Sequence, residues 1–422
     1  MSDTLTHCPN CGAKLTEHPL EVTWCDACDW NIDPNEKPPA PGSLNALATH
    51  LNEKHARALR DDVLAHPEAR PGRDTRAALA ILFAVLIHLP VLACGGMGLF
   101  TVVRFWPYII PVLLGVTAVA TALRLLINID PVPKGTLPRA EHPALFGLVD
   151  RIAAEMGVRK IDLIALNPFA QTSIGPVGFP PRPLLTLSYP LLFTTPPQQV
   201  VALIAGGLAH LKNGDLLRIG VTGNAWTLLF RFSYAILPAS PPGGRRMPWL
   251  TLLATIPLRI AASLSKGLAN AYYSLTRLDS QRAAYLADRL TARVAGAQHW
   301  SDFLADDAPS VAVLNAAQRL AVSANPLDKK RGYIDEVRAC LQAMSPRERE
   351  RLRRVTLKAG AFANSSLPPT QFRVDVLNAL PRTAPPVVWT DRDHERLQQE
   401  LKPLEAAVAS RAIDLYREYI GA

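Results

Sequence analysis

Six cysteines occur in the 422-residue chain, and four of them have a spacing that is typical of a metal site. Cys8, Cys11, Cys25 and Cys28 form the pattern C-x2-C-x13-C-x2-C. Each C-x2-C turn directs two thiolates at one tetrahedral centre, and Gly12 permits the tight turn after the first pair. Four thiolates saturate zinc and leave no open position for water. We therefore expect a structural zinc ribbon with one Zn²⁺ per chain.

The remaining cysteines, Cys94 and Cys340, are isolated in the sequence and are expected to be small buried hydrophobes without a disulfide. A thioredoxin-like use of the C-x2-C turns would need a βαβ pattern, which the N-terminal sequence lacks. The alternative to a zinc ribbon is that the two C-x2-C turns are reduced, lie at the surface and bind no metal. Zinc-bound thiolates would also indicate a reducing compartment, and hence the cytosol.

Three later segments carry a second group of chemically informative residues. They read GGLAHLKNGD over residues 206–215, AYLAD over residues 284–288 and LPPTQFR over residues 367–373. In this order they resemble the membrane zinc metallopeptidases (gluzincins) that include the HtpX heat-shock protease and the CAAX prenyl endopeptidases. The corresponding family segments read H-E-x-x-H-x-x-N-x-D, E-Y-x-A-D and H-P-P-x-x-x-R. The similarity covers roughly residues 139 to 380, and the ribbon is an addition to it.

The resemblance implies a zinc peptidase fold whose chemistry has been lost. In the family, two histidines four apart on one helix face and a glutamate from the second helix bind zinc, and the intervening glutamate takes a proton from the bound water. The positions of the first histidine, the general base and the third ligand hold Gly206, Gly207 and Ala284. His210 alone remains of the ligands, and Asp288 matches a residue that orients a ligand histidine. One imidazole does not hold zinc in a catalytic site, so no catalytic residue is expected.

Other interpretations of these residues stay open. A displaced active site could use His210, Asp215, Asp279 and Asp288, although such carboxylates also cap helices or face solvent. His210 by itself is more typical of a packed or hydrogen-bonded histidine than of a ligand, and chance similarity of amphipathic helices is a further explanation. Leu367 replaces the histidine of the third family segment. The two mid-helix glycines each cost about 1 kcal/mol relative to alanine, which suggests close approach of another backbone or helix.

The elements that would position these residues follow from periodicity and capping. The pattern predicts a helix over 143–157, strands over 160–166 and 183–188, and a helix over 196–213 with proline in its first turn. A further helix from about 270 to 296 would carry the second segment. This order predicts an α/β unit.

Two apolar stretches precede that unit. Residues 77–103 contain no charge and residues 106–127 carry only Arg124, so each can cross roughly 30 Å of hydrocarbon. They predict a transmembrane hairpin. Residues 219–264 are also apolar but contain arginines, and they form either a second membrane hairpin or helices that lie in the interface. We favour membrane association for this region.

Composition and charge agree with a partly membrane-embedded protein. Hydrophobic residues make up 49% of the chain, charged residues 19%, and the formal net charge is +9. Arginines and lysines flank the apolar stretches, which favours anionic membrane lipid over nucleic acid as their partner. The positive-inside rule places both ends of the hairpin in the cytoplasm. Because residues 1–40 are polar, no signal peptide is expected, and we predict a multi-pass protein of the inner (cytoplasmic) membrane whose N-terminus and peptidase-like domain face the cytoplasm.

The connecting segments have simpler patterns. Residues 34–42 are a stiff proline-rich linker, and residues 43–66 have the spacing of an amphipathic helix. The highly charged residues 344–354 are typical of a solvated helix, and residues 391–419 predict a closing amphipathic helix or a short coiled segment for a partner.

The expected fold class is α+β and mostly helical, combining a zinc ribbon, a transmembrane hairpin and a metallopeptidase-like α/β core with further membrane-associated helices. In chain order, the expected domains are the ribbon (1–33), linker and amphipathic helix (34–76), hairpin (77–127), degenerate metallopeptidase-like domain (139–385) and C-terminal helix (386–422).

The expected function is that of a pseudopeptidase that binds protein segments without cleaving them, as a scaffold or regulator in membrane-protein quality control. An extended peptide could add to the sheet edge near residues 167–188. The expected partners are membrane lipid and a protein or peptide segment; an oligomer stays open. One alternative is an active membrane zinc metalloendopeptidase with atypical ligands. Another is a zinc-ribbon membrane adaptor for a nucleic-acid or ribosomal partner.

Overall fold

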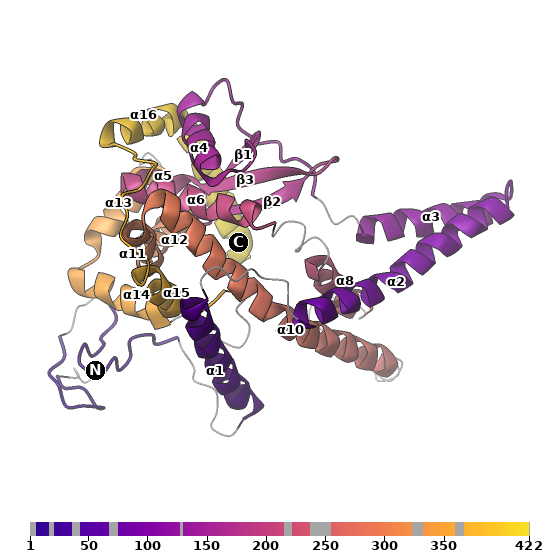
Figure 1. Cartoon of the computed structure of the whole chain (residues 1–422), viewed down its shortest axis with the longest axis horizontal. Coiled ribbons are helices and arrows are strands. Elements are labelled where there is room, and N and C mark those ends of the chain that lie inside the picture. The colour runs from indigo at the N-terminus through magenta and orange to yellow at the C-terminus, as the bar shows by residue number, and fades with distance from the viewer. Residues whose placement is uncertain are drawn as a thin grey trace.

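The structure is a computed structural model that describes residues 6–16, 21–35, 43–66, 75–126, 130–214, 222–236, 255–322, 332–358 and 367–421. It is mostly helical, as expected, with one small sheet (Figure 1). The elements are α1 (Leu44–Ala65), α2 (Thr75–Arg104), α3 (Ile109–Leu126), α4 (Pro143–Met156), β1 (Leu163–Asn167), β2 (Ser173–Val177), β3 (Arg182–Ser188), α5 (Tyr189–Thr194), α6 (Pro197–Lys212), α8 (Asn224–Ala235), α10 (Ile256–Ala295), α11 (Ala297–Ala305), α12 (Ala308–Val322), α13 (Tyr333–Ala343), α14 (Pro346–Lys358), α15 (Thr370–Asn378), α16 (Asp391–Leu401), the 3₁₀ turn η4 (Lys402–Leu404) and α17 (Glu405–Ile420).

The sheet has three strands in the order β1-β3-β2. β1 and β3 are parallel, and β2 runs antiparallel to β3 with Ser173 opposite Thr186. The two expected strands are therefore present, within three residues of their predicted starts, and β2 is an additional strand. Its sequence, SIGPV, contains glycine and proline, which are depleted in strands, so propensity gave no signal for it.

The main core lies where α4 and α6 pack beside the sheet. α4 agrees with the helix predicted over 143–157; it has Pro143 in its first turn and is capped by Gly157 in the left-handed conformation. Along α6, a run of small and branched apolar side chains from Val200 to Ala205 is largely buried. Burial of apolar surface stabilises a folded unit by roughly 25 cal/mol per Å², so these buried side chains contribute to its stability.

Helix α10 is longer than predicted and links two parts of the molecule. It has 40 residues, so it extends about 60 Å at 1.5 Å per residue. Its C-terminal half packs against α6, and its N-terminal half packs against α2 and α8. Tyr272 of α10 shares a small apolar cluster with Ala80, Ala84 and Ala225.

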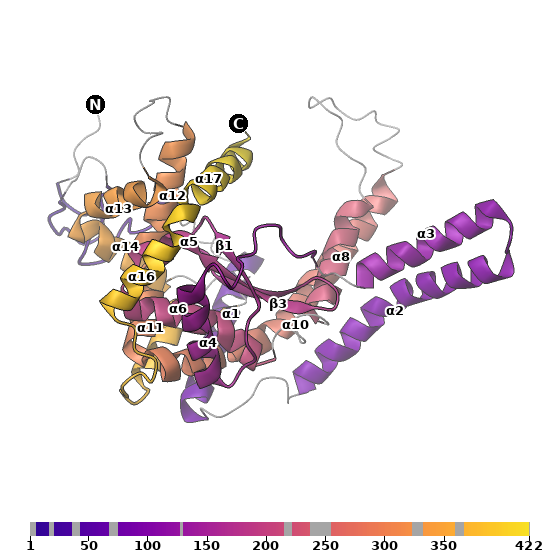
Figure 2. The ribbon, with the colours of Figure 1, turned by 90° about the horizontal axis from the view of Figure 1, so that it is seen from above.

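Helices α2 and α3 form a hairpin that projects from the domain, as Figures 1 and 2 both show. Both are long and apolar enough to cross a membrane, with mean hydropathies of 2.4 over Ala78–Arg104 and 2.1 over Ile109–Leu126. The two helices approach closely at Gly98 and Gly115. A Cβ on Gly115 would lie 2.6 Å from the carbonyl oxygen of Gly98, which leaves no room for a side chain.

The structure describes part of the proposed second membrane region. α8 has 12 residues, about 18 Å, which is too short to cross the hydrocarbon core. Asn224 at its start donates to the carbonyl oxygens of Leu125 and Leu126 at 3.2 and 3.3 Å and thereby ties α8 to the end of α3. Residues 237–254, Arg245 and Arg246 among them, lie outside the described residues, so the second hairpin stays a prediction.

Two terminal elements differ in detail from the sequence patterns. The amphipathic helix over 43–66 is present as α1, with the Ser43 hydroxyl capping its first turn. The expected closing helix is instead two helices, α16 and α17, separated by η4. Pro403 lies in that 3₁₀ turn, and a proline both lacks an N–H and crowds the preceding helical turn.

Candidate functional site

The four N-terminal cysteines are close together in the structure. Their Sγ atoms all lie within 4.8 Å of one another, with Cys8 and Cys28 at 3.6 Å and Cys11 and Cys25 at 3.5 Å. Gly12 has φ +74°, so the first turn needs the conformation that glycine adopts freely. Four converging thiols fit a tetrahedral metal with sulfur ligands, and they could hold a metal ion such as zinc.

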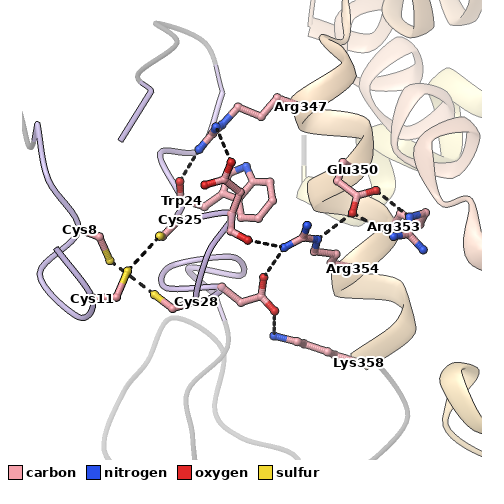
Figure 3. A network of polar contacts seen from close by, with 12 residues as sticks. Cys8, Cys11, Trp24, Cys25, Cys28, Arg347, Glu350, Arg353, Arg354 and Lys358 are labelled. Carbon is pink, nitrogen blue, oxygen red and sulfur yellow. Dashed lines mark hydrogen bonds and ion pairs between the residues drawn. The ribbon is translucent and has the colours of Figure 1, made fainter. Parts of the chain in front are cut away.

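The ribbon packs against helix α14 through Trp24, whose side chain is 1% exposed (Figure 3). The guanidinium groups of Arg347 and Arg354 lie 5.0 and 5.1 Å from the Trp24 ring, and Arg347 also donates to the Trp24 carbonyl oxygen. Asp29 accepts from Arg354 at 2.9 Å and pairs with Lys358 at 2.7 Å. Burial alone would raise the pKa of Asp29, but these two cations outweigh it and lower the pKa.

Further polar contacts extend this interface along α14. Ser345, directly before the helix, donates from its hydroxyl to Glu21 at 2.6 Å, and Arg351 donates to the carbonyl oxygen of Ile32 at 2.6 Å. Hydrogen bonds from Arg353 and Arg354 lower the pKa of Glu350 to about 2. The interpretation of residues 344–354 as a solvated helix is therefore wrong. Arg347, Arg351 and Arg354 bind backbone carbonyls and an indole of the ribbon, a role that charge content alone does not reveal.

The glycine pair of α6 lies against side chains of other elements. A Cβ on Gly206 would lie 3.0 Å from Cη2 and 3.3 Å from Cζ2 of Trp300 in α11, and a Cβ on Gly207 would lie 3.1 Å from Cδ1 of Leu185 in β3. The expected close approach of another helix is present at Gly206, where the indole of Trp300 in α11 packs, whereas at Gly207 a leucine side chain of β3 approaches. No space remains at Gly206 for a larger side chain without movement of Trp300.

Trp300 connects the glycine pair to a buried ion pair. Its indole Nε1 donates to Asp288 Oδ1 at 2.8 Å. Arg373 donates to both oxygens of the same carboxylate, from Nε to Oδ2 at 2.8 Å and from Nη2 to Oδ1 at 2.6 Å. Asp288 is 1% exposed. Burial alone would lower the pKa of Arg373, but the charge and hydrogen bonds of Asp288 outweigh it and raise the pKa.

These contacts bring all three sequence segments together. Gly206 contacts Trp300, which bonds Asp288 of the second segment, which in turn pairs with Arg373 of the third. The Asn213 amide donates at 3.1 Å to the carbonyl oxygen of Ala283, the residue directly before the second segment, which ties the first segment to α10 again.

The other candidate residues are placed as follows. Ala284 is buried in α10, beside Ala283. His210 is partly buried near the end of α6, and its side chain or backbone interacts with another group of the protein. Asp279 is buried on α10, and Asp215 lies outside the described residues. Within the part of the chain that the structure describes, one group of three or more metal-ligating side chains is close enough to share an ion, and it consists of the four cysteines.

A polar cavity of about 740 Å³ lies among α6, α11, α14 and α15. Gln199, Asp302 and Arg349 are among its lining residues, whereas Gly206, His210 and Asp288 are not. The cavity is therefore separate from the glycine pair.

Sequence reasoning missed Trp300, the residue that joins the glycine pair to Asp288. It lies shortly after the long helix α10, in the sequence GAQHW, and none of the three family segments includes it. A glycine pair in mid-helix was the signal that something large packs there.

No protein-family model matches the chain, and no solved structure matches it.

Proposed function

We propose that this protein is a membrane-anchored pseudopeptidase of the HtpX-like metallopeptidase fold, which binds protein segments as a scaffold or regulator and does not cleave them. The observation that carries the proposal is the contact of Trp300 with Gly206 and with Asp288. An indole occupies the side of α6 where the family's first metal ligand would project.

Catalysis of the metallopeptidase type needs three protein ligands, a bound water and a base beside it. Here Gly206 and Gly207 have no side chain to offer, and Ala284 offers only a methyl group. The carboxylate of Asp288 is already satisfied by Arg373 and Trp300. A buried carboxylate that is paired this way holds helices α10, α11 and α15 together instead of orienting a metal ligand.

The membrane anchor in this proposal is the α2–α3 hairpin, with α8 and the N-terminal half of α10 beside it. Exposed apolar side chains continue from the hairpin onto these helices, among them Phe232, Ile256, Ile260 and Leu264. Both hairpin ends would face the cytoplasm, because the segments before and after the hairpin carry several arginines and lysines, whereas its tip carries only Arg104. A reducing cytosol would also keep the four thiols available for zinc.

The surface proposed for a protein segment is the outer edge of β2. Pro176 lies opposite Pro183, and neither residue has a backbone N–H, so this is a non-hydrogen-bonded pair. Because the pairing alternates, Ile174 opposite Leu185 is also non-hydrogen-bonded, and its N–H and C=O point away from β3. An added strand would bond at Ile174, near Thr172, whose methyl group lies close to Gly207.

Two rival functions predict different arrangements. An active peptidase with atypical ligands would need a second group of metal-ligating side chains around His210, whereas among the described residues the four cysteines form the group close enough to share an ion. A ribbon that serves as a free adaptor would keep its surface available. Trp24 and Asp29 are committed to α14, which favours the ribbon as a structural part of this molecule.

The experiment is a paired cleavage and binding assay on the full-length protein in detergent, with casein as the unfolded probe. We expect casein to bind without chelator-sensitive cleavage. Ile174→Pro should weaken binding because it removes the outward N–H at an edge position that tolerates proline, whereas Ile174→Val should bind as the wild type does. Cleavage that a chelator abolishes would overturn the proposal, as would binding that is the same in both variants.

A further inference from the structure

The turn between β2 and β3 carries an exposed apolar tip. Its sequence is Gly178-Phe179-Pro180-Pro181, followed by Arg182 at the start of β3. Phe179 is 87% exposed, and the two prolines and Arg182 are exposed as well. Phe179 and the two prolines are consecutive and all exposed, so they form one continuous apolar tip, and a continuous exposed apolar patch can mark an interaction surface.

The tip is fixed beside the segment that leaves α3. Gly178 donates from its N–H to the carbonyl oxygen of Asp130 at 2.9 Å, and Asp130 forms a bridge with Val177. Val132 packs with Val177 in a small apolar cluster. Four Cα–Cα steps of 3.8 Å separate Asp130 from Leu126, the last residue of α3, so these two Cα atoms lie within about 15 Å.

Figure 1 shows the β2–β3 hairpin directed toward the end of α3, on the side of the domain from which the α2–α3 hairpin projects. The tip therefore lies at the level where the proposed membrane span ends. Arg124 in the last turn of α3 marks the same level, because arginine near a span end extends toward the headgroups.

The composition of the tip matches that level of a bilayer. Aromatic side chains are enriched at the membrane–water interface, where an apolar ring meets the headgroup region. Arg182 and the exposed Lys134 on the neighbouring segment provide positive charge for lipid phosphate. Neither proline has an N–H, so the tip can approach lipid with fewer unsatisfied backbone donors.

We propose that the β2–β3 tip inserts Phe179 into the lipid interface at the end of α3, as a second membrane contact of the cytosolic domain. The contact fixes the orientation of β2, so that its outer edge at Ile174 is held close to the membrane surface. A protein segment bound there would be one that emerges from, or lies along, the bilayer. This inference rests on the proposed membrane anchoring by α2 and α3.

The test is photocrosslinking of the full-length protein in vesicles of phosphatidylcholine and phosphatidylglycerol. The photoreactive residue p-benzoylphenylalanine replaces Phe179 in one sample. It replaces Leu113 of α3, which is 60% exposed, as the positive control, and Tyr419 near the end of α17, which is 85% exposed, as the negative control. Lipid adducts are then measured by mass spectrometry.

We expect adducts at positions 179 and 113 and none at position 419. Adducts at 113 without adducts at 179 would overturn this inference and leave the membrane anchoring in place. Adducts at neither 113 nor 179 would overturn the anchoring and this inference with it. Equal adducts at 179 and 419 would also contradict the inference, because contact would then not depend on the place in the fold.

Discussion

The Arg373 guanidinium lies across the carboxylate of Asp288, with Nε 2.8 Å from Oδ2 and Nη2 2.6 Å from Oδ1. Two parallel hydrogen bonds of this kind fix the relative positions of the helices that carry them. Since Trp300 donates to the same carboxylate, Asp288 holds α10, α11 and α15 together. The residue that the family pattern would assign to support of a metal ligand is thus committed to a structural ion pair.

Removal of one partner of this pair should be more damaging than removal of both. Arg373→Met leaves the buried carboxylate of Asp288 uncompensated and should lower the free energy of unfolding by about 3–5 kcal/mol. The double variant with Asp288→Leu should recover part of that loss. Denaturant unfolding of the detergent-solubilised protein measures both. A double variant less stable than Arg373→Met alone would contradict this role.

The glycine at position 206 should be required by packing. In an exposed helix interior, Gly→Ala stabilises by about 1 kcal/mol, but here the new methyl group would lie 3.0 Å from the Trp300 ring, which is held by its bond to Asp288. Gly206→Ala should therefore give no stability gain or a loss in a thermal unfolding assay. Gly147→Ala in α4, where nothing lies within 4 Å, is the matched control and should stabilise. Equal gains at both positions would show that Trp300 does not fill the site.

The metal should hold the ribbon against α14. Cys8→Ser removes one of four ligands, and a structural zinc site contributes its binding energy directly to folding. We expect loss of zinc and faster trypsin cleavage after Arg347 and Arg354, because both guanidinium groups would lose Trp24. Cys94→Ser, outside the cluster, should change neither. If trypsin cleaved the zinc-free Cys8→Ser protein no faster than the wild type, the packing of the ribbon on α14 would not depend on the metal.

The close approach of α2 and α3 should depend on Gly115. Valine there would place atoms within van der Waals distance of the Gly98 carbonyl and of Val102, so Gly115→Val should force the helices apart and lower thermal stability in detergent by roughly 1–3 kcal/mol. Gly96→Val lies on the same hairpin with nothing within 4 Å and should be tolerated. Equal losses in both variants would mean that general effects of valine, and not the crossing, are responsible.

Sequence reasoning worked where a local rule decides the structure. The C-x2-C spacing placed four sulfurs together, the predicted helices over 43–66 and 143–157 agree with α1 and α4, and uncharged stretches marked α2 and α3. Each of these follows from bonding or solvation within a few residues of the chain. The family similarity and the loss of activity are not settled by such rules and stay predictions.

Sequence reasoning failed where distant segments decide. α14 has the charge pattern of a solvated helix, and its arginines find partners only because the ribbon, more than 300 residues earlier, packs against it. Strand β2 forms despite Gly175 and Pro176 because β3 supplies a ladder, with the two prolines at non-bonded positions. Trp300 reaches Gly206 only once α10 and α11 have folded back on α6. No local pattern encodes these pairings.

Elemental analysis of zinc in the purified full-length protein tests the central claim most directly, with Cys8→Ser analysed in parallel. The account predicts one zinc per chain in the wild type and none in Cys8→Ser, because the four thiolates form the single structural site. Two zinc ions per wild-type chain would show that a second site survives and would contradict the loss of the catalytic metal.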